Sequence, residues 1–211
     1  MPCRDRMGVL GLVVGISLWG LFHSLLASEK AKQLARGWMG APAERGYRLA
    51  YNLFAVFSLL PVAAAYVWLP DLLLYSLPFP WTALMWLLQL AALGMLAFGL
   101  LQTGLGTFVG LTQLEGETEG EARLVTTGLY RYVRHPLYVA GMALLWLSPS
   151  MSMNHLSVSV AATAYLLIGA GFEERKLLRA FGEAYREYVA RTPMFIPFSR
   201  TRNSRPDPPQ P

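Results

Sequence analysis

Five side chains in the C-terminal half of the sequence have the types and the spacing that chemistry requires. They are Arg134, His135, Tyr138, Glu173 and Glu174. Each lies at the end of an apolar segment, where membrane proteins rarely keep ionisable groups without a functional reason. A carboxylate pair can bind a cation, whereas an arginine or a histidine can bind a carboxylate. We therefore interpret these residues as one candidate site.

The local sequence around Pro136 predicts how the two parts of this site meet. Pro136 is suited to the first turn of a helix, where its missing N–H costs nothing, and it keeps His135 out of the helical conformation. The apolar segments 137–149 and 156–171 that follow are both short for independent membrane spans. We expect them to form a tight helical hairpin that brings the glutamate pair back to the membrane face of Arg134 and His135.

Each residue has a simpler interpretation when it is taken alone. Arg134 could be a membrane-surface anchor. Tyr138, Tyr185 and Tyr188 could be interfacial or core aromatics. The glutamate pair could stabilise a helix N-terminus. The functional interpretation depends on all of them occurring in one order and spacing.

The composition predicts an all-α integral membrane protein. Of the 211 residues, 54% are hydrophobic and only 15% are charged, whereas soluble domains average about a quarter charged residues. Three apolar runs, residues 7–27, 47–69 and 81–105, are long enough to cross the roughly 30 Å hydrocarbon core. With the hairpin they give about five transmembrane helices. Residues 174–191 have an apolar stripe at helical spacing, which predicts a C-terminal amphipathic helix on the cytoplasmic side.

The distribution of lysine and arginine predicts the orientation. The first and third loops and the C-terminal tail carry four, three and eight basic residues, whereas the other two loops carry none. By the positive-inside rule, the candidate site then lies on the cytoplasmic side. We expect a bacterial inner-membrane protein with membrane lipid as a partner.

Other classes of protein are disfavoured. The net charge of +5 comes without a basic module interleaved with aromatic residues, so we expect no nucleic-acid partner. A single cysteine, Cys3, excludes an intrachain disulfide. The three histidines show no metal-ligand spacing, and the acidic run 115–121 is most simply a solvated loop, so we expect no metal. No span has paired charges at its centre, which argues against a transporter.

The combined motifs resemble the isoprenylcysteine carboxyl methyltransferase superfamily. Residues 124–198 contain L-V-T-x-G-x-Y, R-H-P-x-Y, a short hairpin, E-E, F-G-x-x-Y-x-x-Y and P-x-x-I-P-F in that order. The N-terminal part is similar to bacterial members, through Phe22-His-Ser-Leu-Leu-Ala-Ser28, residues 48–52 and Phe108-Val-Gly-Leu111. These members include methanethiol S-methyltransferase-like proteins and membrane proteins associated with nitric oxide and nitrite metabolism. The hairpin segment 146–155 looks closest to the thiol-methylating branch.

The resemblance implies a five-helix membrane core that binds S-adenosyl-L-methionine as its cofactor. It implies cofactor contacts at Leu124, Val125, Tyr130, His135, Pro136, Leu137, Tyr138, Glu173 and Glu174. Arg134 and His135 are the candidate catalytic residues. A carboxylate suits the ammonium and ribose hydroxyls of the cofactor, Arg134 or His135 suits its carboxylate, and tyrosine faces suit the sulfonium. A thiol acceptor must lose its proton, and His135 is the nearest candidate base.

One departure from the pattern bears on the methyl acceptor. Methyltransferases of prenylated proteins in this superfamily carry a basic residue about one turn before the glutamates, assigned to the substrate carboxylate. Here that place is occupied by Gly169, Ala170 and Gly171. The sequence therefore favours a small thiol, or another lipophilic acceptor that partitions into the membrane, over a prenylcysteine.

Two alternative functions remain open at this point. A phospholipid N-methyltransferase shares the membrane-embedded plan and a glutamate pair. A membrane protein of nitric oxide or nitrite metabolism could have the same fold without turnover. For the domain organisation we expect N-terminal transmembrane helices in residues 1–110, the methyltransferase-like region in 111–198 and a disordered tail in 199–211.

Overall fold

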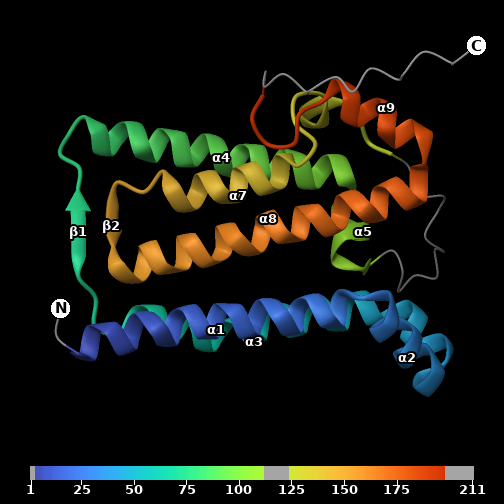
Figure 1. The fold of residues 1–211 in the computed structure, drawn as a ribbon, viewed down its shortest axis with the longest axis horizontal. Helices are drawn as coiled ribbons and strands as arrows, with labels where there is room; N and C mark the ends of the chain where they lie inside the picture. Colours follow the sequence, from blue (N-terminus) through green and yellow to red (C-terminus); the bar gives the residue numbers. More distant parts are fainter. Residues whose placement is uncertain (1–2, 112–123, 198–211) are drawn as a thin grey trace, which may run out of the picture.

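The computed structural model describes residues 3–111 and 124–197, and these residues are mostly helical (Figure 1). The acidic run 115–121 and the expected tail 199–211 lie outside the described residues. In chain order the elements are α1 (Cys3–Ala27), α2 (Glu29–Met39), α3 (Ala41–Trp68), β1 (Leu73–Ser76), α4 (Trp81–Thr103), α5 (Leu105–Val109), the 3₁₀ helix η1 (Gly128–Arg131), α7 (Pro136–Trp146), β2 (Ser150–Ser152), α8 (Met153–Phe181) and α9 (Glu183–Arg191).

Four helices are long and apolar enough to cross a membrane. They contain the spans Gly8–Ala27, Arg45–Trp68, Trp81–Thr103 and Met153–Phe181. The fifth helix of the bundle, α7, has only 11 residues and is too short to cross the hydrocarbon core alone. Large apolar side chains such as Phe57, Leu87 and Ile168 are more than 60% exposed, as expected for surfaces that face lipid. The prediction of an all-α membrane protein is confirmed.

Small residues allow the helices to approach closely, which is the usual basis of helix packing in membranes. Helix α1 packs against α3 and α8, and α4 packs against α7. At one crossing Leu137 of α7 fills the space over Gly99 of α4, so close that a Cβ at Gly99 would lie 2.6 Å from it. Ala140 of α7 and Ala170 of α8 are fully buried. The helices of the N-terminal and C-terminal regions therefore form one bundle.

The structure corrects the expected hairpin and amphipathic helix. Helix α8 is not short: it runs for 29 residues and includes the glutamate pair and the residues up to Phe181. The expected helix 174–191 is divided at Gly182, which has a φ of +54°, a conformation that glycine adopts at low cost. The chain turns there, and α9 crosses the end of the bundle (Figure 1).

Two segments expected to be loops have regular structure. The basic segment after the first span contains α2, because the Ser28 side chain accepts a hydrogen bond from the N–H of Ala31 and caps the helix. At the opposite end of the bundle, the segment after α3 forms β1, which pairs antiparallel with β2. Asp71 extends this connection by accepting a hydrogen bond from the backbone N–H of Asn154. The sheet closes the end away from the candidate site.

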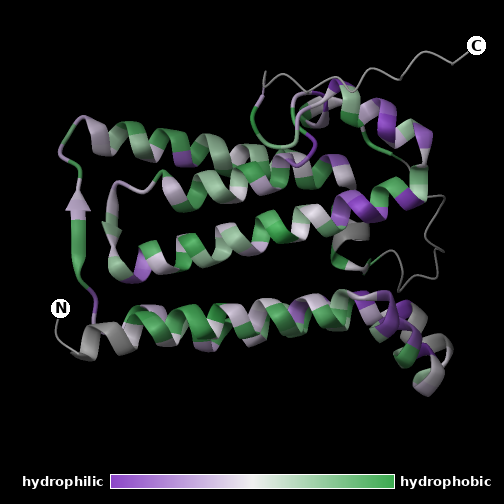
Figure 2. Cartoon of the chain, in the orientation of Figure 1, coloured by the Kyte–Doolittle hydropathy of each residue, from purple (hydrophilic) through white to green (hydrophobic). Residues whose placement is uncertain are grey.

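Hydrophilic residues gather at the other end of the bundle (Figure 2). They belong to α2, to the last turns of α8, and to α9. Hydrophobic residues predominate along the middle of the long helices. This distribution is that of a membrane protein with one polar, largely helical face. The candidate site lies at this polar face.

Candidate active site

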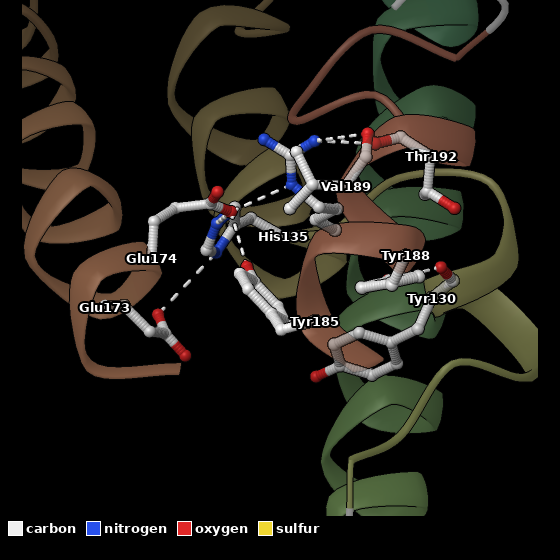
Figure 3. Close-up of polar contacts among 9 residues, drawn as sticks. Tyr130, His135, Glu173, Glu174, Tyr185, Tyr188, Val189 and Thr192 are labelled. Carbon is white, nitrogen blue, oxygen red and sulfur yellow. Dashed lines mark hydrogen bonds and ion pairs between the residues drawn. The ribbon is translucent and has the colours of Figure 1, made fainter. Parts of the chain in front are cut away.

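Three elements meet at the polar end and bring the predicted residues together (Figure 3). His135 is the residue before the first turn of α7, and Pro136 occupies the first helical position as expected. Glu173 and Glu174 lie on α8, and Tyr185 and Tyr188 lie on α9. Residues almost 40 positions apart in the sequence are thus in direct contact.

Backbone hydrogen bonds fix the segment that carries Arg134 and His135. The N–H of Arg134 donates to the carbonyl of Pro193 at 2.9 Å, and the N–H of His135 donates to the carbonyl of Met194 at 3.2 Å. Phe195 then packs on His135, with ring centroids 5.6 Å apart. The proline-containing segment after α9 therefore holds the start of α7 in place.

One oxygen of Glu174 is surrounded by donors. Its Oε1 accepts hydrogen bonds from Arg134 Nε at 2.9 Å, His135 Nε2 at 2.8 Å and the Tyr185 hydroxyl at 2.7 Å. The Arg134 guanidinium also donates to the carbonyl of Thr192 at 2.6 Å. These bonds join the start of α7, the end of α8 and α9 into one network around Glu174.

Glu173 has a different environment from its neighbour. Its side chain is 45% exposed, whereas that of Glu174 is 19% exposed. Its Oε2 lies 3.6 Å from His135 Nδ1, which is an ion-pair distance but longer than a good hydrogen bond. Tyr138, whose ring stacks on His135 with 5.3 Å between centroids, also interacts with this carboxylate. Glu173 is thus the carboxylate with capacity left for a ligand.

His135 is buried between the two carboxylates, and each ring nitrogen faces one of them. Burial alone would lower the pKa of His135, but the hydrogen bonds and negative charges of Glu173 and Glu174 outweigh it and raise the pKa above its ordinary value of 6.5. The geometry therefore favours the doubly protonated imidazolium. A group held in this way is suited to orienting carboxylates and poorly suited to accepting a proton.

This environment predicts a pH-dependent contribution of His135 to stability. Because its pKa is raised in the folded protein, the contribution is complete below about pH 6.5 and is lost as the pH rises through the folded-state pKa. We expect the difference in melting temperature between the wild type and His135→Gln to be largest near about pH 6 and to shrink toward about pH 9. Thermal unfolding of detergent-purified protein would check this, and a difference that grows with pH would contradict it.

The 3₁₀ helix η1 places Tyr130 beside α9. The Tyr188 hydroxyl donates to the backbone carbonyl of Tyr130 at 2.5 Å. Burial, with a smaller effect from the charge of Glu173, raises the pKa of Tyr130 to about 12. Its phenol therefore stays neutral at physiological pH and can donate a hydrogen bond.

The other residues predicted to contact the cofactor lie in different parts of the structure. Pro136 is fully buried at the start of α7. The Leu137 side chain points to Gly99 of α4, so it contributes packing there. Leu124 and Val125 are half-buried in the irregular segment that leads into η1. The structure thus joins Arg134, His135, Tyr138, Glu173 and Glu174 directly and sets the other predicted residues around them.

Gln102 near the end of α4 is a site-supporting residue that sequence reasoning missed. Its Oε1 accepts a hydrogen bond from the backbone N–H of Leu129 at 3.2 Å, which fixes η1 and therefore Tyr130. A glutamine within an apolar span is the signal that could have identified it. Gly128 makes the contact possible, because a Cβ there would lie only 1.8 Å from Gln102 Nε2.

Gly128→Ala should disturb this support and destabilise the protein. The residue has a φ of +62°, which costs a residue with a Cβ roughly 1–2 kcal/mol, and the Gln102 amide must move away from Leu129. We expect a fall in melting temperature of several degrees. In the double variant with Gln102→Ala the steric conflict is removed but the backbone strain at position 128 remains. The melting temperature of the double variant should therefore not exceed that of the single Gln102→Ala variant. An unchanged melting temperature for Gly128→Ala would contradict this description.

Comparison with known proteins agrees with these features. A family model described as "Protein of unknown function (DUF1295)" matches residues 31–192. The chain is 30% identical to methanethiol S-methyltransferase 1 of Bradyrhizobium diazoefficiens, over 93% of this chain and 70% of the relative. It is 30% identical to methanethiol S-methyltransferase of Crocosphaera subtropica, over 90% and 76%, and 33% identical to that of Pseudomonas deceptionensis, over 89% and 72%. No solved structure gives a significant match. The chain therefore belongs to the DUF1295 family and, with these relatives, to the methanethiol S-methyltransferase-like membrane proteins.

Proposed function

We propose that this protein is an S-adenosyl-L-methionine-dependent membrane methyltransferase whose acceptor is a small thiol. The observation that carries the proposal is the pair of unequal carboxylates. Glu174 is used in holding three elements together, whereas the half-exposed Glu173 beside Tyr138 and His135 is open to a ligand. The relatives named methanethiol S-methyltransferase support the reaction class and the acceptor.

The donor set around Glu173 fits the cofactor. A carboxylate can bind an ammonium group or ribose hydroxyls, and the stacked faces of His135 and Tyr138 form an aromatic wall next to it. Tyrosine faces attract a sulfonium through the ring quadrupole. We propose that Glu173 binds the cofactor and that Tyr130, with its neutral hydroxyl, contributes a donor from η1.

Arg134 has a supporting role in this proposal. Its side chain is only 10% exposed, and its donors are directed to Glu174 and the carbonyl of Thr192. Arg134 therefore holds Glu174, and through it His135, in position. Of the two sequence candidates for the cofactor carboxylate, Arg134 and His135, we therefore propose His135.

Methyl transfer from the cofactor is an in-line displacement, and the cofactor supplies the electrophilic methyl group. The protein's task is to align donor and acceptor and to exclude water, and alignment alone can supply several orders of magnitude in rate. The start of α7, held by the segment 193–195, and α8 provide rigid supports for this alignment. A thiol acceptor must also be deprotonated before attack.

The residues before the glutamate pair support a neutral small acceptor. Gly169 and Gly171 of α8 have no side chain, and Ala170 is fully buried against the bundle. This part of α8 therefore offers no cation to a substrate carboxylate. We propose on this ground that a prenylcysteine is not the acceptor.

We further propose that the site faces the cytoplasm and that α2 lies on the membrane surface beside it. Helix α2 is at the polar end of the bundle and exposes Trp38 and Leu34 by 85% and 63%. It also carries Lys30 and Lys32, which suit anionic lipid headgroups. A reporter fused after residue 197 that is active only in the cytoplasm would test the orientation.

The test of the proposed function has two readouts. Calorimetry with detergent-purified protein measures binding of S-adenosyl-L-methionine, and gas chromatography of the headspace measures dimethyl sulfide formed from methanethiol. We expect saturable binding and methylation of methanethiol, with no methylation of a prenylcysteine analogue. Binding without any thiol product would refute the acceptor, and a well-folded sample that binds no cofactor would refute the enzyme assignment.

A further inference from the structure

A second polar cluster lies within the membrane-spanning helices, separate from the contacts around Glu174. It joins His23 of α1, Tyr51 of α3 and Tyr165 of α8. The Tyr165 hydroxyl is 2.7 Å from His23 Nδ1, and the Tyr51 hydroxyl is 2.6 Å from His23 Nε2. Trp19 stacks on the imidazole at 4.9 Å. Polar groups in a lipid-embedded segment are costly and by default indicate function.

Tyr165, the member of this cluster that belongs to α8, lies on the same face of that helix as Glu173, the candidate cofactor carboxylate. Tyr165, Gly169 and Glu173 follow one another at intervals of four residues on α8, so they lie on one face. At 1.5 Å per residue, Tyr165 is about 12 Å along the axis from Glu173. Gly169 has no side chain, and the atom nearest to the place that a Cβ would take is the Tyr138 hydroxyl, at 3.9 Å. No α8 side chain therefore separates Glu173 from Tyr165 along this face, and this row of positions is the path from Glu173 to His23.

The packing of α1 admits Tyr165 to this position. A Cβ at Gly20 would lie 2.8 Å from the Tyr165 ring, so only glycine allows the ring to lie directly on α1 and to reach His23 with its hydroxyl. The cluster therefore depends on a close helix contact and not only on three polar side chains.

A comparison with His155 shows what is unusual about His23. His155 Nε2 is 2.8 Å from the backbone carbonyl of Leu145, which can only accept, so this nitrogen carries the proton. Its Nδ1 can then only accept from Tyr66, and the tautomer is fixed. Both nitrogens of His23 face hydroxyls instead, and a hydroxyl can donate or accept. His23 can therefore exchange its tautomers and take up a proton on either nitrogen by reversing hydrogen bonds, whereas His155 can take one up only on Nδ1.

The proposed reaction needs such a group. A thiol reacts as the thiolate, but the carboxylates on either side of His135 raise its pKa and favour its imidazolium form. It cannot serve readily as the base. Among the described residues, His23 is the histidine that combines an uncommitted tautomer with a place on the path from Glu173.

We propose that His23, through Tyr165, accepts the proton of the acceptor thiol, and that the thiol binds between Tyr165 and Glu173. This inference rests on the proposed function. The thiol gives its proton to the Tyr165 oxygen while Tyr165 passes its own proton to His23 Nδ1, and Tyr51 accepts from the Nε2–H of the resulting imidazolium. The sulfur electron pair forms the new S–CH₃ bond as the CH₃–S⁺ bond of the cofactor breaks, with its electrons left on the cofactor sulfur. The proton on His23 is later released to solvent.

The test compares His23→Gln and Tyr165→Phe with the wild type, and His155→Gln is the matched control at the other end of the bundle. The acceptors are methanethiol, which is protonated near neutral pH, and thiophenol, which is largely ionised at about pH 8. We expect His23→Gln and Tyr165→Phe to lower kcat/KM for methanethiol by about 100-fold or more, the usual range for loss of proton transfer. For thiophenol the loss should stay within about threefold, because no proton need be removed.

The pH profile provides a second readout that a purely structural role would not change. With methanethiol, kcat/KM of His23→Gln should rise about tenfold per pH unit as the thiol ionises, whereas the wild type should level off where His23 is neutral. Cofactor affinity by calorimetry should be the same in all four proteins. If the wild type does not accept thiophenol, the slope of this profile decides the question.

Two failures are distinguishable. Equal losses for both thiols, or a pH profile parallel to that of the wild type, would overturn the role of His23 while leaving thiol methylation intact. A wild type that binds the cofactor but methylates neither thiol would overturn the proposed acceptor and this inference together. His155→Gln matching His23→Gln in every readout would also overturn the inference.

Discussion

Glu173→Gln is expected to weaken binding of S-adenosyl-L-methionine by at least about tenfold while leaving the fold intact. The change removes the charge of a carboxylate that is 45% exposed, lies 3.6 Å from His135 and interacts with Tyr138. A cationic ligand loses its counter-ion, whereas the folded protein loses little stability. Charge-assisted hydrogen bonds contribute about 1.5–3 kcal/mol each, so affinity should fall by at least about tenfold for each such bond.

Glu183→Gln is the matched control for this experiment. Glu183 is also at the polar end of the bundle, but its side chain is 70% exposed and pairs with Arg186 on the surface of α9. Such a pair contributes little to stability. Calorimetry should show normal affinity for Glu183→Gln and an affinity at least about tenfold lower for Glu173→Gln, with similar melting temperatures. Normal affinity for Glu173→Gln would remove this residue from the cofactor site.

The sequence predicted which residues of the candidate site lie together better than it predicted the shape of the helices that carry them. The proline after His135 and the spacing of the apolar segments were sufficient to predict that the glutamate pair returns to Arg134 and His135. The pattern did not separate the membrane-spanning part of α8 from its polar end, because an apolar run and an amphipathic run can belong to one continuous helix. Only the backbone at Gly182 decides where that helix ends.

The two carboxylates could not be distinguished from the sequence. Adjacent residues on a helix point about 100° apart, so a glutamate pair must present one carboxylate in each of two directions. Which direction faces Arg134 and Tyr185 depends on the rotation of α8 and on the position of α9. The same limit applies to His23, because its partners come from α3 and α8, and no local pattern specifies how these helices cross.

Glu174→Ala is expected to reduce stability strongly, in contrast to its neighbour. The change leaves Arg134 Nε, His135 Nε2 and the Tyr185 hydroxyl without their shared acceptor. Removing one partner from a buried ionic network costs about 3–5 kcal/mol. With Glu174 at 19% exposure and Arg134 at 10%, we expect the lower end, about 3 kcal/mol. For a chain of this size that corresponds to a fall in melting temperature of roughly 6–12 °C.

Glu174→Gln separates the loss of charge from the loss of the acceptor. Its amide oxygen can still accept one or two of the three hydrogen bonds, so its melting temperature should lie between those of the wild type and Glu174→Ala. If Glu174 binds the cofactor directly and has little structural role, Glu174→Gln should instead lose affinity at an unchanged melting temperature, as expected for Glu173→Gln. Melting curves and calorimetry on the four variants therefore assign the two carboxylates. The structure predicts opposite outcomes for them, although they are neighbours in the chain and chemically identical.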